Sequence, residues 1–283
     1  MKVSIICPLY NAEAYVGDLY ESILKQKNVE IEEIKFVLTE STDKTEFILN
    51  EIGASYEVVK KKDFSHSLVR EKSAMEAKGD IIVFITQDIQ LDGEEWLEKL
   101  VQGIIKGECE ASFSRQIGYK NHGLERYIRE VNYPNQSRIV SKMDVEELGI
   151  MCFFFSDASS AIKKDVFVEL NGYDGKKLPT NEDMYFAYKL IMNGYRIKYE
   201  AESRIIHSHE YSAKEVYSRY KSIGKFFAEN PHIGEFKATK KGAGVLKYVL
   251  KRAIQDKNYK IIVDLFVNFS SRLIGMTVGK INK

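Results

Sequence analysis

Four short clusters of polar residues in this 283-residue chain could hold a cation and move a proton. They occupy residues 8–11, 39–43, 86–88 and 181–183, and a His-Ser-His triplet follows at 207–209. A carboxylate together with an imidazole can bind Mg²⁺ or Mn²⁺ and leave coordination positions open for diphosphate oxygens. A separate carboxylate at a helix start can accept the proton of an incoming hydroxyl.

Asp88 is the most informative of these residues because it ends the stretch 79–88, which contains a continuous run of Ile, Val and Phe. Such a run predicts a strand buried on both faces of a parallel sheet. Ligands of these sheets bind beyond the carboxyl ends of the strands. A plainer interpretation is that Asp88 forms a turn or cap after the strand.

The other candidates also have plainer interpretations. Glu182 and Asp183 could simply begin a helix, where acidic residues are common. A histidine in an apolar strand is more often structural than a ligand, so His207 and His209 gain interest only beside Asp88 and Asp183. The two histidines alternate along a predicted strand and should point to opposite faces, so we expect only one to reach a metal.

The elements that would position these residues alternate regularly through the first part of the chain. Apolar runs predict strands at 3–7, 34–38, 57–60 and 79–88, and helical spacing predicts helices at 12–26, 41–52, 68–77 and 96–105. Alternation of this kind implies right-handed crossovers and a parallel sheet.

The pattern loosens after residue 110. We expect a strand at 111–115, a loop or lid at 116–149, a strand at 151–155, helices at 162–170 and 181–193, and edge strands at 196–200 and 204–207. Three further helices are expected at 216–227, 245–254 and 260–274.

Composition predicts one large catalytic domain with an appendage, since 44% hydrophobic and 12% aromatic residues exclude a disordered chain. Cys7, Cys109 and Cys152 lack the spacing of a zinc site and are expected to be reduced core thiols, which suits the cytoplasm. The apolar amino terminus is too short for a secretory signal. No segment has roughly 18 uninterrupted apolar residues, so we expect a soluble or peripheral protein.

The net charge of +1 hides a strong asymmetry. Residues 213–283 contain 15 Lys and Arg against 5 Asp and Glu, whereas residues 1–212 contain 27 against 36. Basic amphipathic helices bind acidic membrane surfaces by apolar insertion and charge attraction. The alternative is a solvated helical cap on the catalytic domain.

Two sets of motifs resemble a known family. Residues 3–11, Ser22, Ile23, Gln26 and residues 41–45 resemble the opening of family 2 glycosyltransferases with the GT-A fold. The resemblance narrows to the bacterial rhamnosyltransferase branch at residues 64–70, 84–88, 96–97, 114–116, 133–134, 154–157, 181–184 and 207–209. It covers approximately residues 1–224, and the tail at 272–280 is also similar.

The resemblance implies an α/β fold of the GT-A type. A mostly parallel, nucleotide-sugar-binding sheet would be flanked by helices and followed by a C-terminal helical extension. The expected catalytic domain is 1–212, with a nucleotide-binding half at 1–115 and an acceptor-binding half at 116–212. Residues 213–283 would form the basic amphipathic helical region.

The resemblance also implies roles for individual residues. Asp88 corresponds to the last carboxylate of the family's DxD motif, which would bind the metal with His207, and Asp183 corresponds to the general base. The residues expected to bind the nucleotide or donor are Pro8, Tyr10, Asn11, Thr39, Glu40, Asp43, Arg70, Gln87 and Asp88. The candidates for contacts with donor-sugar or acceptor hydroxyls are Arg115, Gln116, Asp157 and Glu182.

Several positions depart from the family pattern. Thr86 replaces the first carboxylate of DxD, as is usual in the rhamnosyl branch, and removes one charge from the cation site. Leu38 and Thr39 stand where many members carry the Asp pair that reads the base. Glu71 and Ser73 replace the Asn and Gly that often follow the arginine.

The expected function is an inverting glycosyltransferase that uses Mg²⁺ or Mn²⁺ and moves L-rhamnose from dTDP-β-L-rhamnose to a hydroxyl of a cell-surface polysaccharide. The acceptor would be lipid-linked and presented at the cytoplasmic face of the membrane. The alternatives are a UDP- or GDP-hexose donor, or an inactive homologue that binds nucleotide sugars or glycans. A nucleotidyltransferase is disfavoured because no glycine-rich phosphate loop follows residues 3–7.

Overall fold

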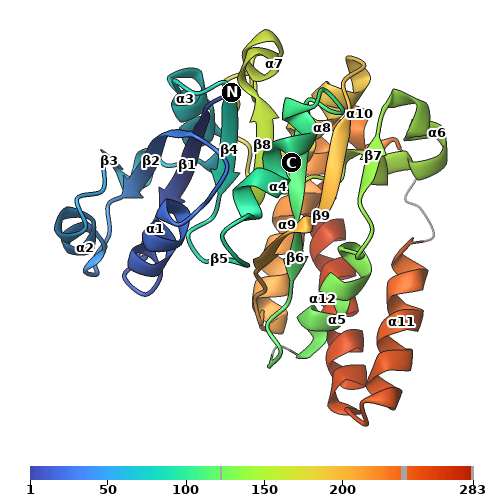
Figure 1. The fold of residues 1–283 in the computed structure, drawn as a ribbon. Coiled ribbons are helices and arrows are strands. Elements are labelled where there is room, and N and C mark those ends of the chain that lie inside the picture. Colours follow the sequence, from blue (N-terminus) through green and yellow to red (C-terminus); the bar gives the residue numbers. More distant parts are fainter. Residues whose placement is uncertain (122, 237–240, 282–283) are drawn as a thin grey trace.

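The structure is a computed structural model that describes residues 1–121, 123–236 and 241–281. One mixed sheet forms its centre, helices cover both faces of the sheet, and a group of C-terminal helices packs beside it (Figure 1). This is an α/β fold, as predicted.

The first half of the sheet is the parallel layer that the alternating pattern predicts. Its strands, in spatial order, are β3 (Tyr56–Val59), β2 (Ile31–Thr39), β1 (Val3–Leu9) and β4 (Ile81–Ile85). The connections contain α1 (Val16–Leu24), α2 (Thr45–Glu51), the short η1 (Lys61–Asp63) and α3 (His66–Met75). Every residue of β1 and β4 is buried, as their continuous apolar runs require.

The second half makes the sheet mixed. β8 (Ser159–Lys163) runs antiparallel between β4 and β6 (Ala111–Ile117). β9 (Ile197–Ile206) is parallel to β6, and both β5 (Gln90–Leu91) and β7 (Arg138–Val140) pair antiparallel with β9. The prediction of two edge strands at 196–200 and 204–207 is therefore wrong, because β9 is one strand with partners on both sides.

Two other local predictions are also wrong. Residues 151–155 were expected to form a strand, but η3 (Gly149–Phe153) is a 3₁₀ helix. Residues 162–170 were expected to form a helix, but β8 extends to Lys163 and only α7 (Lys164–Glu169) is helical. Short apolar runs do not distinguish a strand from a buried helical turn, so periodicity alone could not decide these cases.

The expected loop at 116–149 contains regular structure. It holds the end of β6, α5 (Gly123–Asn132), β7, η2 (Lys142–Asp144) and α6 (Val145–Leu148). The buried residues of α5 are Leu124, Tyr127 and Ile128, which pack against helices more than 100 residues later. Leu124, Tyr127, Ile128 and Val131 have the spacing of an amphipathic helix, so the local sequence contained this apolar face and the prediction of a loop missed it.

Alternation along the strands divides the core into two layers. Val3, Ile5 and Cys7 pack toward α1 and α4 (Trp96–Ile105), whereas Ile6 and Phe84 pack toward α7 and α8 (Glu182–Met192). Cys7, Cys109 and Cys152 are buried free thiols, as predicted.

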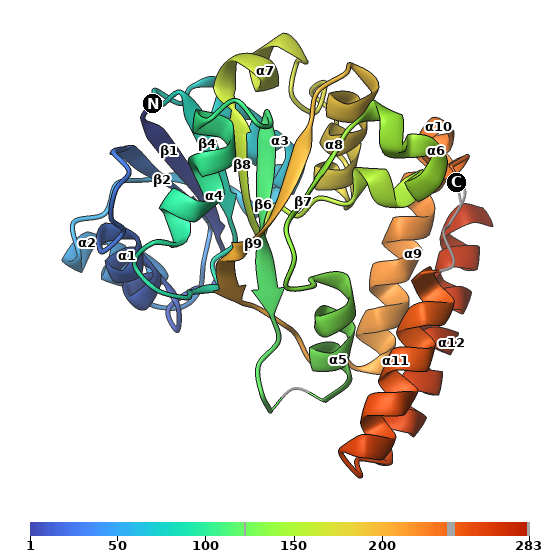
Figure 2. The same ribbon diagram turned by 45° about the vertical axis from the view of Figure 1, so that its right-hand side comes forward.

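The C-terminal helices are α9 (Ala213–Glu229), α10 (Pro231–Gly234), α11 (Lys241–Gln255) and α12 (Lys260–Ile281). The helices α9, α11 and α12 correspond to the three predicted ones, and the short α10 was not predicted. Glycines bring α9 and α12 into close contact, since a Cβ on Gly279 would lie 2.0 Å from the Lys221 carbonyl oxygen. A separate apolar cluster joins α5 to α11 and α12, and Figure 2 shows these helices together below the sheet.

By length and composition, α12 could also cross a membrane, although no run of 18 uninterrupted apolar residues was found in the sequence. The mean hydropathy of its most apolar 18-residue window is 1.5, and only 17% of that window is buried. The remaining face holds α12 against α9 through Gly275 and Gly279. Length and apolarity alone are weak evidence for a span.

Candidate active site

A cavity of about 970 Å³ opens at the carboxyl ends of β1, β2 and β4, where the sequence predicted a ligand site. Residues after these strands form one wall, including Pro8, Tyr10, Thr39 and Asp88. The other walls come from the start of α8, from α5 and from the C-terminal helices α9 and α12. The cavity therefore joins segments from most of the chain.

Asp88, His207 and His209 form a cluster in this cavity that could hold a metal ion. Their ligand atoms all lie within 4.8 Å of one another. His207 Nε2 lies 3.6 Å from Asp88 Oδ1, and His209 Nε2 lies 3.3 Å from Asp88 Oδ2. The expectation that only one histidine would reach the site is wrong, because β9 ends at Ile206 and strand alternation does not extend to His209.

The protonation states of the cluster also suit a cation. Burial lowers the pKa of His207, and it lowers the pKa of His209 to about 4, so both imidazoles are neutral near pH 7. Burial opposes ionisation of Asp88, but hydrogen bonding and charge interaction with His207 outweigh it, and the pKa falls to about 2. One carboxylate and two neutral imidazoles fit Mg²⁺ or, better, Mn²⁺.

Gln116 orients His207 from behind the cluster. Its Oε1 accepts a hydrogen bond from Arg129, while its Nε2 donates to Ser156 Oγ at 2.8 Å, so the direction of the amide is fixed. His207 Nδ1 lies 3.1 Å from the same Oε1 and must donate to it, so the neutral ring turns the lone pair of Nε2 toward the cluster, 3.1 Å from His209 Nε2 and 3.6 Å from Asp88 Oδ1. A hydrogen bond from the other ring nitrogen is what orients metal-binding histidines in proteins.

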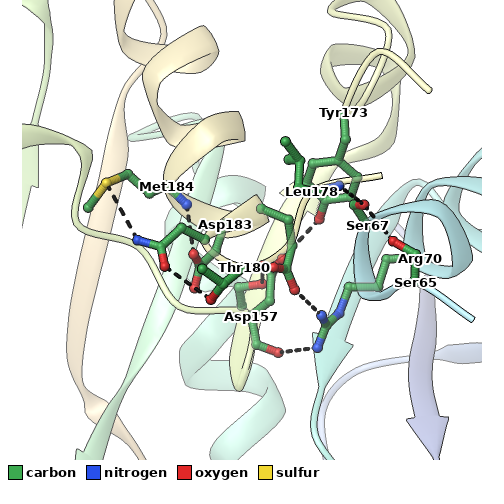
Figure 3. A network of polar contacts seen from close by, with 12 residues as sticks. Ser65, Ser67, Arg70, Asp157, Tyr173, Leu178, Thr180, Asp183 and Met184 are labelled. Atoms are coloured by element: carbon green, nitrogen blue, oxygen red, sulfur yellow. Dashed lines mark hydrogen bonds and ion pairs between the residues drawn. The ribbon is translucent and has the colours of Figure 1, made fainter. Parts of the chain in front are cut away.

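A group of acidic residues lies at the start of α8 and around Arg70 (Figure 3). Arg70 is 2% exposed and donates to Glu182 at 2.5 Å and to the Asp157 carbonyl at 3.5 Å. The Asp157 carboxylate accepts from Ser160 at 2.7 Å and from Tyr173 at 2.9 Å. Arg70, Glu182 and Asp157 thus bind one another, which limits their freedom to contact a ligand directly.

Asp183 lines the cavity from this acidic group. Among the described residues it accepts one hydrogen bond, from the backbone N–H of Met184 at 2.8 Å. Burial raises its pKa to about 8, and the nearby carboxylates of Glu182 and Asp157 add to the shift. Such a carboxyl can act as a proton acceptor in neutral or mildly alkaline solution.

Several residues that were predicted to bind the nucleotide instead hold together the loops on which it is expected to bind. Gln87 accepts from the Tyr10 N–H at 2.7 Å and donates to the Tyr10 carbonyl at 3.0 Å. The Asn11 side chain accepts from the Thr42 N–H at 3.0 Å, and that of Glu40 accepts from the Lys61 N–H at 3.0 Å.

Asp43 has a similar part, since its carboxylate accepts from Thr45 Oγ1 at 2.6 Å at the start of α2. Four predicted residues, Asn11, Glu40, Asp43 and Arg115, do not line the cavity, although Pro8, Tyr10, Thr39, Arg70, Gln87 and Gln116 do. Two lining threonines, Thr39 and Thr86, have buried hydroxyl oxygens without a hydrogen-bond partner among the described residues.

The sequence interpretation missed some lining residues. Lys61 donates to the Tyr10 hydroxyl at 2.7 Å and faces the mouth of the predicted nucleotide site. Arg129, Arg219 and Arg272 also line the cavity and come from three different helices. Only the excess of basic residues in the C-terminal region hinted at two of them.

Comparison with known proteins identifies the class. Residues 4–170 match the model of Glycosyl transferase family 2. The chain therefore belongs to this family and is a glycosyltransferase.

Two named relatives are similar in sequence over most of this chain. The chain is 33% identical over 239 residues to the O-antigen chain rhamnosyltransferase RfbN of Salmonella typhimurium, covering 82% of this chain and 74% of the relative. It is 31% identical to the O-antigen chain rhamnosyltransferase WbaN of Salmonella anatum, covering 81% and 73%.

Solved structures share the fold at low sequence identity. The Staphylococcus aureus TarS fragment 1–349, in complex with UDP-GlcNAc, superposes with a TM-score of 0.62 at 18% identity and covers 92% of this chain and 75% of its own. The mannosyltransferase PcManGT from Pyrobaculum calidifontis, in complex with GDP-Man and Mn²⁺, has a TM-score of 0.66 at 14% identity, with 99% and 87% covered.

Proposed function

We propose that this protein is an inverting, metal-dependent rhamnosyltransferase that transfers L-rhamnose from dTDP-β-L-rhamnose to a hydroxyl of a lipid-linked polysaccharide acceptor. The observation that carries the proposal is the presence, in one cavity, of the Asp88, His207 and His209 cluster and the raised-pKa carboxyl of Asp183. The choice of sugar is supported by the two O-antigen rhamnosyltransferases.

The protein's own residues have distinct parts in this reaction. Asp88, His207 and His209 would hold Mg²⁺ or Mn²⁺, which as a Lewis acid neutralises charge on the leaving diphosphate. Asp183 accepts the proton of the attacking hydroxyl, whose oxygen forms the new bond to the anomeric carbon. The bond to dTDP breaks on the other side of that carbon, so the β-linked donor gives an α-linked product.

The remaining expected contacts follow from the geometry. Pro8, Tyr10 and Thr39 line the cavity and would bind the nucleotide, while Asn11, Glu40, Asp43 and Gln87 would hold its loops in shape. Gln116 would orient His207, and Arg70 with Glu182 and Asp157 would position Asp183. Arg115 does not line the cavity and would therefore contribute to acceptor binding only indirectly.

Two alternatives to this function can be tested. The first is a UDP- or GDP-hexose donor, which the ligands of the TarS and PcManGT structures favour. The second is an inactive homologue that binds nucleotide sugars and would need no proton acceptor. A thermal-shift screen of UDP-, GDP- and dTDP-sugars with Mn²⁺ separates the donors, because a ligand that binds only the native state raises the unfolding midpoint.

The expected result is the largest shift with dTDP-rhamnose and Mn²⁺, together with slow release of dTDP without an acceptor. A larger shift with a UDP- or GDP-sugar would reject the donor. Binding without any nucleotide release, with or without an acceptor extract, would reject the enzyme in favour of the binding homologue.

We further propose that the protein works at the cytoplasmic face of the plasma membrane and docks there through α12. Val263, Phe266, Val267, Leu273 and Ile274 are 47–70% exposed and fall on one side of this helix. Lys260 and Lys280 are exposed near its two ends. An apolar stripe with basic ends suits an interfacial helix on an acidic bilayer.

Flotation with vesicles of anionic and zwitterionic phospholipid tests this docking. Leu273→Glu should reduce the floated fraction, whereas Phe47→Glu, at a 60% exposed position on α2, should not. Equal flotation of both variants would reject α12 as the docking surface.

A further inference from the structure

The part of the cavity formed by the later helices carries three arginines. Arg129 comes from α5, Arg219 from α9 and Arg272 from α12, and all three line the cavity. We call these three residues the arginine wall. Arg129 also donates to Gln116, which orients His207, so the arginine wall begins beside the cation cluster.

Acidic neighbours neutralise only part of this charge. Glu125 lies 3.9 Å from Arg129 Nε and 3.5 Å from Arg272 Nη2. Arg219 has no carboxylate partner among the described residues, and its guanidinium lies 5.8 Å from the Tyr211 ring centre. Two of the arginines therefore share one carboxylate, and the third has none among the described residues.

The guanidinium groups of the arginine wall also have unused hydrogen-bond donors. Arg129 Nε is buried and has no hydrogen-bond partner among the described residues. Arg272 Nε donates to Asn268 at 2.6 Å, which fixes its guanidinium at the wall and leaves its other nitrogens to Glu125 and the cavity. Planar guanidinium groups match the oxygens of phosphate and diphosphate in geometry as well as charge.

The position of Arg272 indicates which phosphate fits. At about 100° per residue, Arg272 is on the opposite side of α12 from Val263 and Phe266 of the exposed apolar stripe. One helix thus has a cation toward the cavity and an apolar surface toward solvent. If the stripe lies on the bilayer, as proposed above, Arg272 stands one helix diameter from the lipid, within reach of the anionic head of an amphiphile that projects from the membrane.

We propose that the arginine wall binds the diphosphate of the lipid-linked acceptor, at a subsite beside the donor diphosphate held near Asp88. The proposal rests on the function proposed above. It adds that the acceptor is recognised through its charged head as well as its sugar, so acceptors without a diphosphate bind more weakly.

Isothermal titration of the full chain with farnesyl diphosphate tests the subsite directly. The titration is made with Mn²⁺ and a saturating amount of the nucleoside diphosphate that gives the largest thermal shift. Saturable binding is expected, and farnesol should bind much more weakly. Arg219→Gln and Arg272→Gln should each weaken the affinity about tenfold or more, because each removes charge-assisted hydrogen bonds.

Lys214→Gln is the matched control, because Lys214 is an exposed cation of α9 that does not line the cavity. Its affinity for farnesyl diphosphate should be unchanged. Arg219→Gln is the informative variant if Arg272→Gln lowers the melting temperature, since within the described part of the chain Arg219 has no carboxylate to leave unpaired.

Three results would overturn the subsite. Loss of probe binding when the nucleotide is added would show that the wall serves the donor diphosphate. Unchanged affinity in Arg219→Gln would show that the charge is not used, and equal binding of farnesol would show an apolar surface only. If no nucleotide shifts the melting temperature, the proposed function fails, while probe binding to the free protein is still measurable.

Discussion

The cation cluster and the acidic group beside α8 lie in the same cavity and are both largely buried, yet their carboxyl groups behave in opposite ways. The pKa of Asp88 falls to about 2, although burial opposes its ionisation, because His207 and His209 are its neighbours. Burial raises the pKa of Asp183 to about 8, and Glu182 and Asp157 reinforce the shift.

The difference shows that burial alone does not set the chemistry of a carboxyl group. Asp88 has two imidazoles and no carboxylate in its cluster, so its charge is available to a cation. Asp183 has two carboxylates nearby and shares one arginine with them, so its proton is held more tightly. Opposite neighbours therefore give one group suited to a metal and one suited to proton transfer.

The largest expected effect comes from removing the proton acceptor. Asp183→Asn should lower turnover by about 10²–10⁴-fold, the usual contribution of a general base, and leave nucleotide affinity nearly unchanged. Steady-state kinetics and calorimetry measure the two quantities. Asp165→Asn on the exposed part of α7 is the control, and turnover of Asp183→Asn equal to that control would place the base elsewhere.

The acidic group should depend on Arg70 for its stability. Arg70→Met leaves the buried Glu182 carboxylate without its partner at 2.5 Å and should cost about 3–5 kcal/mol in the free energy of unfolding. Urea denaturation measures the loss. The control is Arg204→Met, which removes an exposed pair with Asp92 at 2.8 Å and should cost only about 0–1 kcal/mol.

A second substitution separates charge from packing in this pair. If the unpaired charge causes the loss, Arg70→Met/Glu182→Met should be more stable than Arg70→Met alone. No recovery in the double variant would show that Arg70 stabilises the fold by packing instead.

Loss of the hydrogen bond that orients His207 should have a more moderate effect on the cation cluster. Gln116→Leu removes the acceptor that fixes His207 Nδ1 and should weaken Mn²⁺ affinity about 10–100-fold. Calorimetric titration with Mn²⁺ measures this change. Gln102→Leu, at an exposed position of α4, is the matched control, and equal affinities of the two variants would contradict the orienting role.

The smallest effect is the pH dependence. Asp183 must be deprotonated to accept a proton, so kcat/KM should be maximal above its pKa of about 8 and fall as pH decreases through that value. At pH 7 it should be about tenfold below the plateau. Glu182→Gln removes a like charge and should move this limb to lower pH, whereas an unmoved limb would assign the titration to another group.

Much of the fold could be predicted because its first half follows local rules. The buried strands β1 and β4 appear as continuous apolar runs, and the helices between them appear as helical spacing. The mixed second half was harder, because β8 begins with Ser159 and Ser160 and resembles no apolar strand. Its pairing between β4 and β6 depends on segments far away in the chain.

The candidate site, like the fold, could be predicted only in part. Asp88, Asp183 and His207 could be singled out from the sequence, because carboxylates and a histidine follow apolar segments in a pattern that resembles a known family. His209 was set aside because the end of β9 could not be located, and strand alternation was carried two residues too far. The arginine wall was missed because its three members come from three separate helices.

By itself, the sequence determined the alternating first half, the family and the residue types available for a cation and a proton. Only the tertiary structure decided that Arg70 pairs with Glu182, 112 residues away, and that Gln116 orients His207. Periodicity and turn preferences act over a few residues, so the sequence displays them directly. The charge of a buried group depends instead on neighbours that folding brings from distant segments, and these neighbours give Asp88 and Asp183 their opposite properties.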